Sequence, residues 1–189
     1  MRLIPPVLLV LVSLLVSPAA AQDYVEAFNA YQRGEYARAL HDFRTLAKRG
    51  DVLAQYRLGL MYVNGDGVEK DYAESVKWFS RAAIQGYAPA QTSLGVRFEK
   101  GQGVRRNYAE AVRWYRHGAE SGEPMAQYRL GRMYTLGHGV RRDYTEAVAW
   151  FTVAASHGIA DAEKARAAVA AHLSKQQLAN AARKSRERN

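Results

Sequence analysis

The chain has 189 residues, with 27 lysines and arginines against 18 aspartates and glutamates, a formal net charge of +9 and no cysteine. Without cysteine, a disulfide framework and a lipid-modified cysteine anchor are both excluded. The length allows one domain with a substantial core.

Residues 1–21 match a secretory signal peptide. Arg2 precedes an apolar run from Val7 to Val16, and Ala19-Ala20-Ala21 offers an A-x-A cleavage site. Ten helical residues cover about 15 Å, half of a bilayer core, which favours a cleaved signal over the alternative of an uncleaved anchor. We expect cleavage before Gln22 and an exported product, periplasmic or secreted, with no stable membrane insertion. Nucleic acid is a disfavoured partner for an exported protein.

Residues 22–189 are predicted to form one array of repeats with a period of 36 residues, marked by Trp78, Trp114 and Trp150. A fixed period of this length is typical of stacked repeats, in which each unit buries its apolar face against its neighbours. The first unit, residues 24–53, is a degenerate copy in which Gly34-Glu35-Tyr36 replaces a longer loop.

Three full repeats follow, at 54–89, 90–125 and 126–161, and the first and third share 21 of 36 residues. Each is predicted to be an antiparallel helical hairpin. In the first helix, Ala54, Leu58 and Met61 follow helical spacing. Gly59 interrupts this helix at a cost of about 1 kcal/mol relative to alanine, which indicates a close crossing where a Cβ would clash.

Glycines and helix caps separate the helices of each hairpin. Gly65-Asp66-Gly67 ends the first helix of the first full repeat, because glycine readily supplies positive φ. Asp71-Tyr72-Ala73-Glu74 then predicts a capping box at the start of the second helix, with counterparts at residues 107–110 and 143–146.

Residues 162–189 are predicted to form C-terminal capping helices and a basic tail. Ser174-Lys175-Gln176-Gln177 indicates another capping box and a last helix from about residue 175. The segment carries seven basic residues against two acidic ones. This charge indicates either an anionic partner or a frayed, solvated tail, and the sequence leaves both open.

These motifs resemble the Sel-like repeat family, which is related to the tetratricopeptide repeats. The shared signature is A-x-x-x-L-G-x-x-Y-x-x-G-x-G-V-x-x-D-Y-x-x-A-x-x-W-F-x-x-A-A-x-x-G, repeated three times over residues 54–161 with departures at Ser75, Phe98, Gly118 and Val153. The resemblance implies an all-α, right-handed α-solenoid of helix–turn–helix repeats that acts as an adaptor or scaffold. It transfers no catalytic or binding residue to this chain.

No catalytic, cofactor or metal site is predicted. The histidines occupy different repeat positions and have no cysteine to complete a metal set, so we interpret them as surface residues. They are His41, His117, His138, His157 and His172. Asp143 and Glu146 are better explained as helix caps than as an acid/base pair, and the tryptophans as core residues rather than a sugar-binding platform.

The first candidate binding surface is the expected concave face, formed by the first helices of the repeats. Its residues are Tyr56, Arg57, Leu60, Val96, Lys100, Tyr128, Arg129 and Arg132. Mixed aromatic and arginine content suits a protein or peptide ligand. The alternative is that flanking helices partly cover these side chains.

The second candidate is the arginine edge, which consists of Arg105, Arg106, Arg141 and Arg142. These residues occupy equivalent loop positions in neighbouring repeats, so stacking would bring four guanidinium groups onto one edge. Such a group could hold carboxylates or phosphates bidentately, and a solvated loop edge is the alternative.

The sequence therefore predicts a non-catalytic scaffold in the bacterial envelope that binds a protein or peptide through its concave face. One alternative is a binder of an anionic envelope polymer, a polysaccharide or the cell wall, through the basic C-terminal half. A hydrolase acting on the cell wall is a third.

Overall fold

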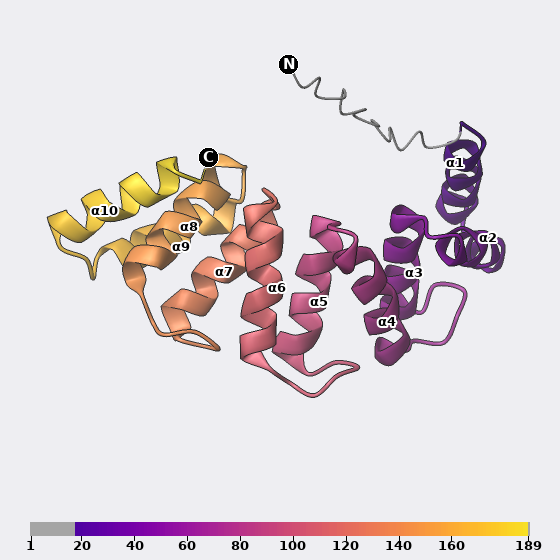
Figure 1. Ribbon diagram of the computed structural model, residues 1–189, viewed down its shortest axis with the longest axis horizontal. Coiled ribbons are helices and arrows are strands. Elements are labelled where there is room, and N and C mark those ends of the chain that lie inside the picture. Colours follow the sequence, from indigo (N-terminus) through magenta and orange to yellow (C-terminus); the bar gives the residue numbers. More distant parts are fainter. Residues whose placement is uncertain (1–17, 189) are drawn as a thin grey trace, which may run out of the picture.

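The computed structural model describes residues 18–188, and this part of the chain is helical without any strand (Figure 1). The helices are α1 (Pro18–Gln32), α2 (Tyr36–Lys48), α3 (Val52–Asn64), α4 (Tyr72–Ile84), α5 (Ala88–Lys100), α6 (Tyr108–Glu120), α7 (Pro124–Leu136), α8 (Tyr144–Ser156), α9 (Ala160–Ala170) and α10 (Lys175–Arg186). None of these helices combines the length and the apolar character that crossing a membrane requires. The expected signal peptide falls mainly on residues 1–17, outside the described residues, and α1 begins upstream of the expected cleavage position.

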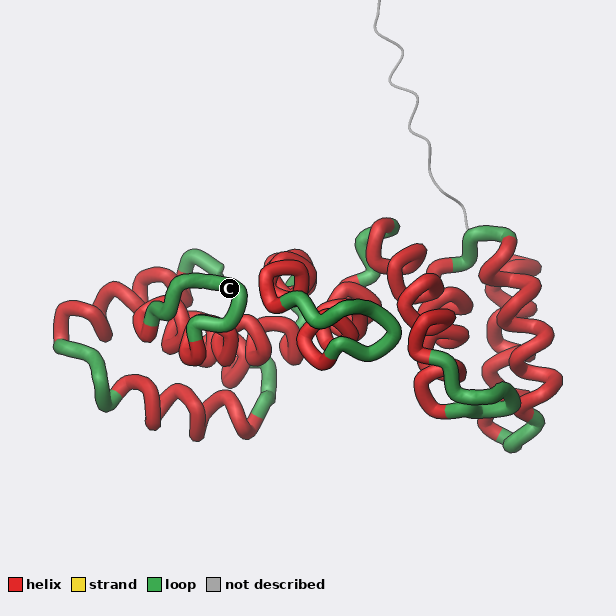
Figure 2. Tube along the Cα trace, turned by 90° about the horizontal axis from the view of Figure 1, so that it is seen from below, coloured by secondary structure: helices red, strands yellow, loops and turns green. Residues whose placement is uncertain are grey.

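Consecutive helices pair as hairpins and the hairpins stack side by side, which confirms the predicted all-α solenoid (Figure 1). The stack is curved, with its two ends above its middle in Figure 1, and the view from below in Figure 2 shows the hairpins in succession. Among the described helices, the consecutive first helices α5 and α7 also touch each other, which favours the expected position of the first helices on the concave side of the curve.

The glycine within each first helix lies under an aromatic ring of the second helix. A Cβ built on Gly95 would lie 2.6 Å from Cε1 of Tyr115, and Phe79 and Phe151 cover Gly59 and Gly131 in the same way. The predicted close crossing is confirmed. The group that forbids a Cβ is a fully buried ring rather than a backbone, which explains why the aromatic residue recurs with the glycine.

The second glycine of each Gly-x-Gly loop joins one repeat to the previous one. A Cβ on Gly103 would lie 2.2 Å from the carbonyl oxygen of Tyr72, and one on Gly139 would lie 2.2 Å from that of Tyr108. Both glycines have φ near +70° (76° and 69°), where other residues are strained. The loops therefore do more than end helices, because each one docks on the N-terminus of the preceding second helix.

The predicted caps of the second helices are half correct. The Asp71 carboxylate accepts hydrogen bonds from the backbone N–H groups of Ala73 and Glu74, at 2.8 and 3.0 Å. The capping box also predicts a hydrogen bond from the Asp71 N–H to the Glu74 side chain. That part of the prediction is wrong, because the Asp71 N–H instead donates to the carbonyl of Tyr62 at 3.0 Å. Glu74 is left to pair with Lys77.

The complete box predicted at the start of the last helix is confirmed. The Gln177 N–H donates to the Ser174 hydroxyl at 3.3 Å, and the Ser174 N–H donates to the Gln177 side chain at 2.9 Å. No preceding helix competes for the Ser174 N–H group as Tyr62 does for that of Asp71.

Tryptophan and glutamine side chains connect neighbouring repeats. Trp78 on α4 packs in a cluster with residues of α2 and α3, and Trp150 on α8 packs with residues of α5, α6 and α7. Their interpretation as core residues is confirmed, although Trp114 is only half-buried. The first helices of the three full repeats, α3, α5 and α7, each carry a buried glutamine whose amide donates to a carbonyl near the end of the previous second helix, as Gln55 does to Ala47 at 3.2 Å.

One tyrosine–arginine pair occurs in alternate repeats. Arg44 Nη2 donates to the Tyr62 hydroxyl at 3.0 Å, and Arg116 Nη2 donates to the Tyr134 hydroxyl at 3.2 Å. Between them, Phe98 has no hydroxyl and the position that would supply the arginine is a serine, at 80. Both partners are therefore changed together in the middle repeat.

The basic tail is docked on the fold. Helix α10 packs against α8, where Lys184 and Arg188 both bind the carboxylate of Glu146, with Arg188 Nη2 at 2.7 Å. Arg188 also lies over the ring of Trp150, with its guanidinium carbon 4.2 Å from the ring centre. The frayed tail that the sequence left open is therefore not what the C-terminal segment forms up to residue 188.

Candidate functional site

Some of the residues expected on the concave face bind other parts of the fold, and others have side chains available to a partner. Arg57 Nε donates to the Tyr24 hydroxyl at 3.3 Å and the guanidinium lies over the ring of Phe28, so it links α3 to α1. Arg129 forms an ion pair with Glu99 at 3.6 Å and lies above Tyr115. Both arginines thus help to hold neighbouring hairpins together.

Val96 is 9% exposed and belongs to the core cluster beneath α6 and α7, so it offers no surface to a partner. Tyr56 is half-buried against the rings of Phe79 and Tyr87, and Leu60 is half-buried beside them. The face is therefore less open in its first half than the sequence pattern indicates.

The open part of the concave face lies between α7 and α9. Here an apolar groove of about 280 Å³, the α7–α9 groove, is formed by Tyr128, Arg132, Thr135, Leu136, Phe151, Ala165, Ala168 and Val169. Leu136 is 50% exposed, although it is a large apolar side chain. Within the described residues Arg132, which lines the groove, forms no ion pair, so the groove is apolar with one positive charge at its side. Lys100, at the end of α5, also forms none but does not line the groove.

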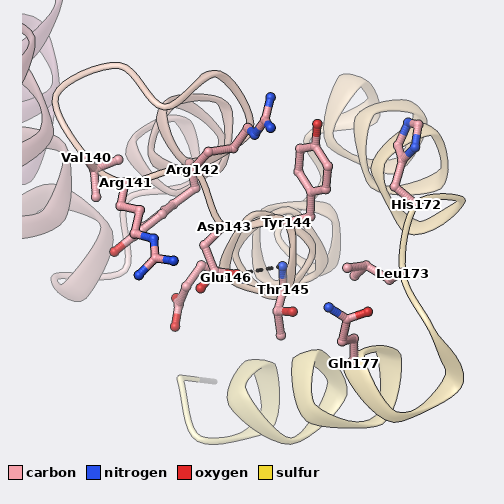
Figure 3. A pocket seen from close by; sticks show the side chains of 11 residues that line it. Val140, Arg141, Arg142, Asp143, Tyr144, Thr145, Glu146, His172, Leu173 and Gln177 are labelled. Atoms are coloured by element: carbon pink, nitrogen blue, oxygen red, sulfur yellow. Dashed lines mark hydrogen bonds between the residues drawn. The ribbon is translucent and has the colours of Figure 1, made fainter.

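The four residues of the arginine edge are exposed, on the loops that join α5 to α6 and α7 to α8. Each loop borders an open groove, of about 540 Å³ beside Arg105 and Arg106 and about 600 Å³ beside Arg141 and Arg142. In Figure 3, the Arg142 side chain extends alongside that of Tyr144, Arg141 lies near Glu146, and His172 and Gln177 lie on the opposite side of the groove. Arg106 and Arg142 lie over Tyr108 and Tyr144, each 5.5 Å from the ring centre.

The carboxylate of Glu146, at the base of the second groove, is already paired with two basic side chains, Lys184 and Arg188. Burial disfavours its charged form, but the hydrogen bonds from Lys184 and Arg188 outweigh burial and hold the pKa of Glu146 below its ordinary value. The groove therefore does not present a free carboxylate at this position that would repel an anion.

A buried arginine in the middle repeat escaped the sequence analysis. Arg97 is 9% exposed, and its Nε and Nη1 atoms have no hydrogen-bond partner in the described structure. Met61 and Met133 occupy the equivalent positions, so the 36-residue alignment alone could have revealed it. Burial lowers the pKa of Arg97, and its guanidinium carbon lies 5.1 Å from the ring centre of Tyr72.

No group of three or more His, Cys, Asp or Glu side chains that could hold a metal ion occurs among the residues that the structure describes. His138 stacks on Tyr108 with ring centres 4.5 Å apart, and His157 Nδ1 lies 2.9 Å from the Gln127 side-chain oxygen. These two histidines therefore support contacts between repeats, while His41 and His117 are exposed.

A comparison with protein-family models matches the Sel1 repeat three times, at residues 52–87, 88–123 and 124–159. The chain belongs to the Sel1 repeat family. The matched segments begin at the first residues of α3, α5 and α7, two residues before the repeats expected from the sequence. The 36-residue period is the same in both divisions.

Solved Sel1 repeat structures resemble this protein closely. A Sel1 repeat protein from Oxalobacter formigenes is 35% identical, with a TM-score of 0.70 over 74% of this chain and 57% of its own. A protective antigen with an SLR fold from uropathogenic Escherichia coli strains is 38% identical, with a TM-score of 0.73 over 76% of this chain and 32% of its own. This chain thus spans about half of the first structure and a third of the second.

A more distant structure shares only the fold. Helicobacter pylori cysteine rich protein B is 20% identical, with a TM-score of 0.52 over 74% of this chain and 93% of its own. No curated protein matches this chain at a significant level.

Proposed function

We propose that this Sel1 repeat protein is a non-catalytic adaptor of the bacterial envelope, and that it holds a partner protein through the α7–α9 groove. Sel1 repeats generally act as protein–protein interaction scaffolds and typically carry no catalytic activity. The envelope location rests on the signal-like pattern of residues 1–21 and on the likeness to an antigen of uropathogenic strains.

The observation that carries the proposal is the combination of an open apolar groove and unpaired positive charge. Phe151, Ala165 and Val169 line the groove, and Leu136 remains half-exposed at its side. A partner can bury this surface with one apolar anchor side chain, which is how most of the energy of such interfaces arises. Arg132 then favours acidic residues next to the anchor. The proposed ligand is therefore a short partner segment with an apolar anchor and an acidic flank.

A site-specific crosslinking experiment tests this assignment. A photoactivatable amino acid at position 136 should capture one defined protein in intact cells. The same amino acid at position 132 should capture the same protein while Leu136 is present, and Leu136→Asp in that second chain should abolish the product. Ile84 provides the matched control, because it is also apolar and 78% exposed but lies at the end of α4.

The expected result is capture that survives Ile84→Asp and is lost with Leu136→Asp. Capture that resists both substitutions, or is lost equally with both, would remove the groove from the proposed function. Turnover of cell-wall fragments by the purified protein would instead favour the hydrolase alternative.

A further inference from the structure

Two equivalent grooves, one repeat apart, line the arginine edge. The first is bordered by Phe98, Arg105, Arg106, Asn107 and Tyr108. The residues 36 positions later are Tyr134, Arg141, Arg142, Asp143 and Tyr144, and all five border the second groove. The repeat therefore generates a similar open, polar surface twice on neighbouring loops, which share the lower edge of the array in Figure 1. The grooves differ in charge at one position, because the amide of Asn107 is replaced by the carboxylate of Asp143, which caps α8 through hydrogen bonds from the N–H groups of Thr145 and Glu146.

The arginine edge gathers four exposed arginines on two neighbouring loops, whereas the other exposed arginines without an ion pair in the described residues, Arg81, Arg116 and Arg186, lie on helices. Within the described residues none of the four forms an ion pair. By contrast, Arg33, Arg38, Arg113 and Arg183 pair with acidic side chains at 2.6, 3.5, 2.9 and 2.6 Å. Positive charge at the edge is therefore not balanced from within the fold.

Several classes of anionic ligand fit this edge poorly. None of the exposed large apolar side chains of the described residues lies in either groove, so the edge lacks the apolar anchors typical of protein interfaces and of inserted membrane surfaces. Nucleobases would need free aromatic faces for stacking. The rings of Tyr108 and Tyr144 instead lie under Arg106 and Arg142.

The remaining chemistry is that of a flexible anionic polymer that also carries hydroxyl groups. Guanidinium groups bind carboxylates bidentately, as they also bind phosphates. The side chains of Asn107, Thr145 and Gln177 add hydrogen-bonding capacity for hydroxyl groups. We propose that the arginine edge binds a linear polysaccharide of carboxylated sugars, which lies across both grooves at once. This site is separate from the α7–α9 groove, so neither proposal depends on the other.

Bridging of the two grooves makes a length dependence the characteristic property of this site. A chain that reaches only one groove gains one pair of arginines, whereas a longer chain binds the second groove at a high effective concentration. Since the attraction is between exposed charges, affinity should also fall steeply with salt.

The experiment measures binding of oligogalacturonates of two and ten sugars to the full mature chain by calorimetry, with neutral dextran of equal length as the control ligand. The variant Arg105→Ala/Arg106→Ala/Arg141→Ala/Arg142→Ala should bind the ten-sugar chain at least about tenfold more weakly. The matched control, Arg33→Ala/Arg38→Ala/Arg113→Ala/Arg183→Ala, removes the same charge from paired positions and should change the affinity less than about twofold. Helical circular dichroism should be unchanged in both.

Each remaining outcome decides the question. A loss confined to the ten-sugar chain when either arginine pair alone is removed supports bridging of the two grooves. Equal losses in both fourfold variants would show nonspecific charge attraction and overturn the proposal. So would absence of binding to the wild-type chain, or tighter binding to polyglutamate or to vesicles with anionic lipids, which would assign the edge to an acidic protein or a membrane surface.

Discussion

Gly95, Arg97 and Tyr115 give the middle repeat an interior unlike that of its neighbours. Tyr115 replaces the phenylalanine found over the other helix glycines, and its hydroxyl donates to Glu99 at 2.5 Å. Burial, together with that hydrogen bond, raises the pKa of Tyr115 far above its usual range, so the hydroxyl remains a donor. Arg97 has no such partner for two of its nitrogens. In the interior of the middle repeat, the buried hydroxyl of Tyr115 therefore has a hydrogen-bond partner, whereas two buried nitrogens of Arg97 have none.

Arg97→Met should therefore stabilise the protein. The substitution removes buried, unpartnered donors and installs the residue that Met61 and Met133 provide in the other repeats, with an expected gain of about 1–3 kcal/mol in the free energy of unfolding. Urea denaturation followed by circular dichroism measures the change. The reverse substitution, Met133→Arg, should destabilise by a similar or larger amount. A destabilising Arg97→Met would show that the contact with Tyr72 outweighs the cost of burial.

At the scale of elements, local signals were predictable and distant partners were not. The caps at Asp71 and Ser174 could be read from four consecutive residues because a cap involves only its own helix. The reciprocal bond failed because the Asp71 N–H meets Tyr62, a residue of the preceding helix. Docking of α10 was missed for the same reason, since Glu146 meets partners 38 and 42 residues away.

The candidate surfaces show the same division between local and distant information. The arginine edge was predictable because its residues are equivalent within the repeat and remain exposed. On the concave face, burial of Val96 depends on α6 and α7, which helical spacing within α5 does not describe. The same spacing does not show that α9 leaves an open groove beside Leu136.

Two glycine substitutions can separate the stability that loop docking provides from the cost of placing alanine at positive φ. Gly103→Ala and Gly122→Ala both place alanine at positive φ, at 76° and 83°, which should cost about 1–2 kcal/mol each. Only at Gly103 does the new Cβ meet the Tyr72 backbone, because nothing lies within 4 Å at Gly122. We expect Gly103→Ala to cost about 1–3 kcal/mol more in urea denaturation. Equal costs would mean that the loop does not support the interface between repeats.

Helix α10 should undock from α8 in acid. The folded-state pKa of Glu146 is lowered, so its contribution to stability is complete above the ordinary glutamate value of about 4.3 and is lost as the pH falls through the folded value. Amide NMR resonances of α10 should shift over that range while those of α3 and α4 remain.

Glu146→Gln gives the control for this titration. It removes the charge at every pH, so α10 of the variant at neutral pH should resemble wild-type α10 in acid, without a further step. An identical acid transition in the variant would assign the transition to another carboxylate.

At the scale of the whole molecule, the array should tolerate loss of one complete repeat. Deletion of residues 88–123 joins α4 to α7, and the interface of α6 with α7 already shows how such helices pack. Stability in solenoids is roughly a sum over repeats and their interfaces, so the shortened chain should fold with lower stability. Circular dichroism and thermal melting measure this.

The control deletion removes residues 88–105, half a period, so that α4 is followed directly by another second helix, α6, without the first helix between them. The packed helices should be mismatched, with loss of the cooperative melt. Cooperative folding of the out-of-register chain, or failure of the in-register one, would contradict the modular account.

Alternation of the Arg44–Tyr62 and Arg116–Tyr134 pairs carries a consequence for how this array can be lengthened or shortened. A cut of one unit leaves the Tyr134 hydroxyl opposite Ser80, whereas a change by two units preserves the match on both sides of the junction. The natural building block for engineering this solenoid is therefore a doublet of 72 residues, twice the 36-residue period.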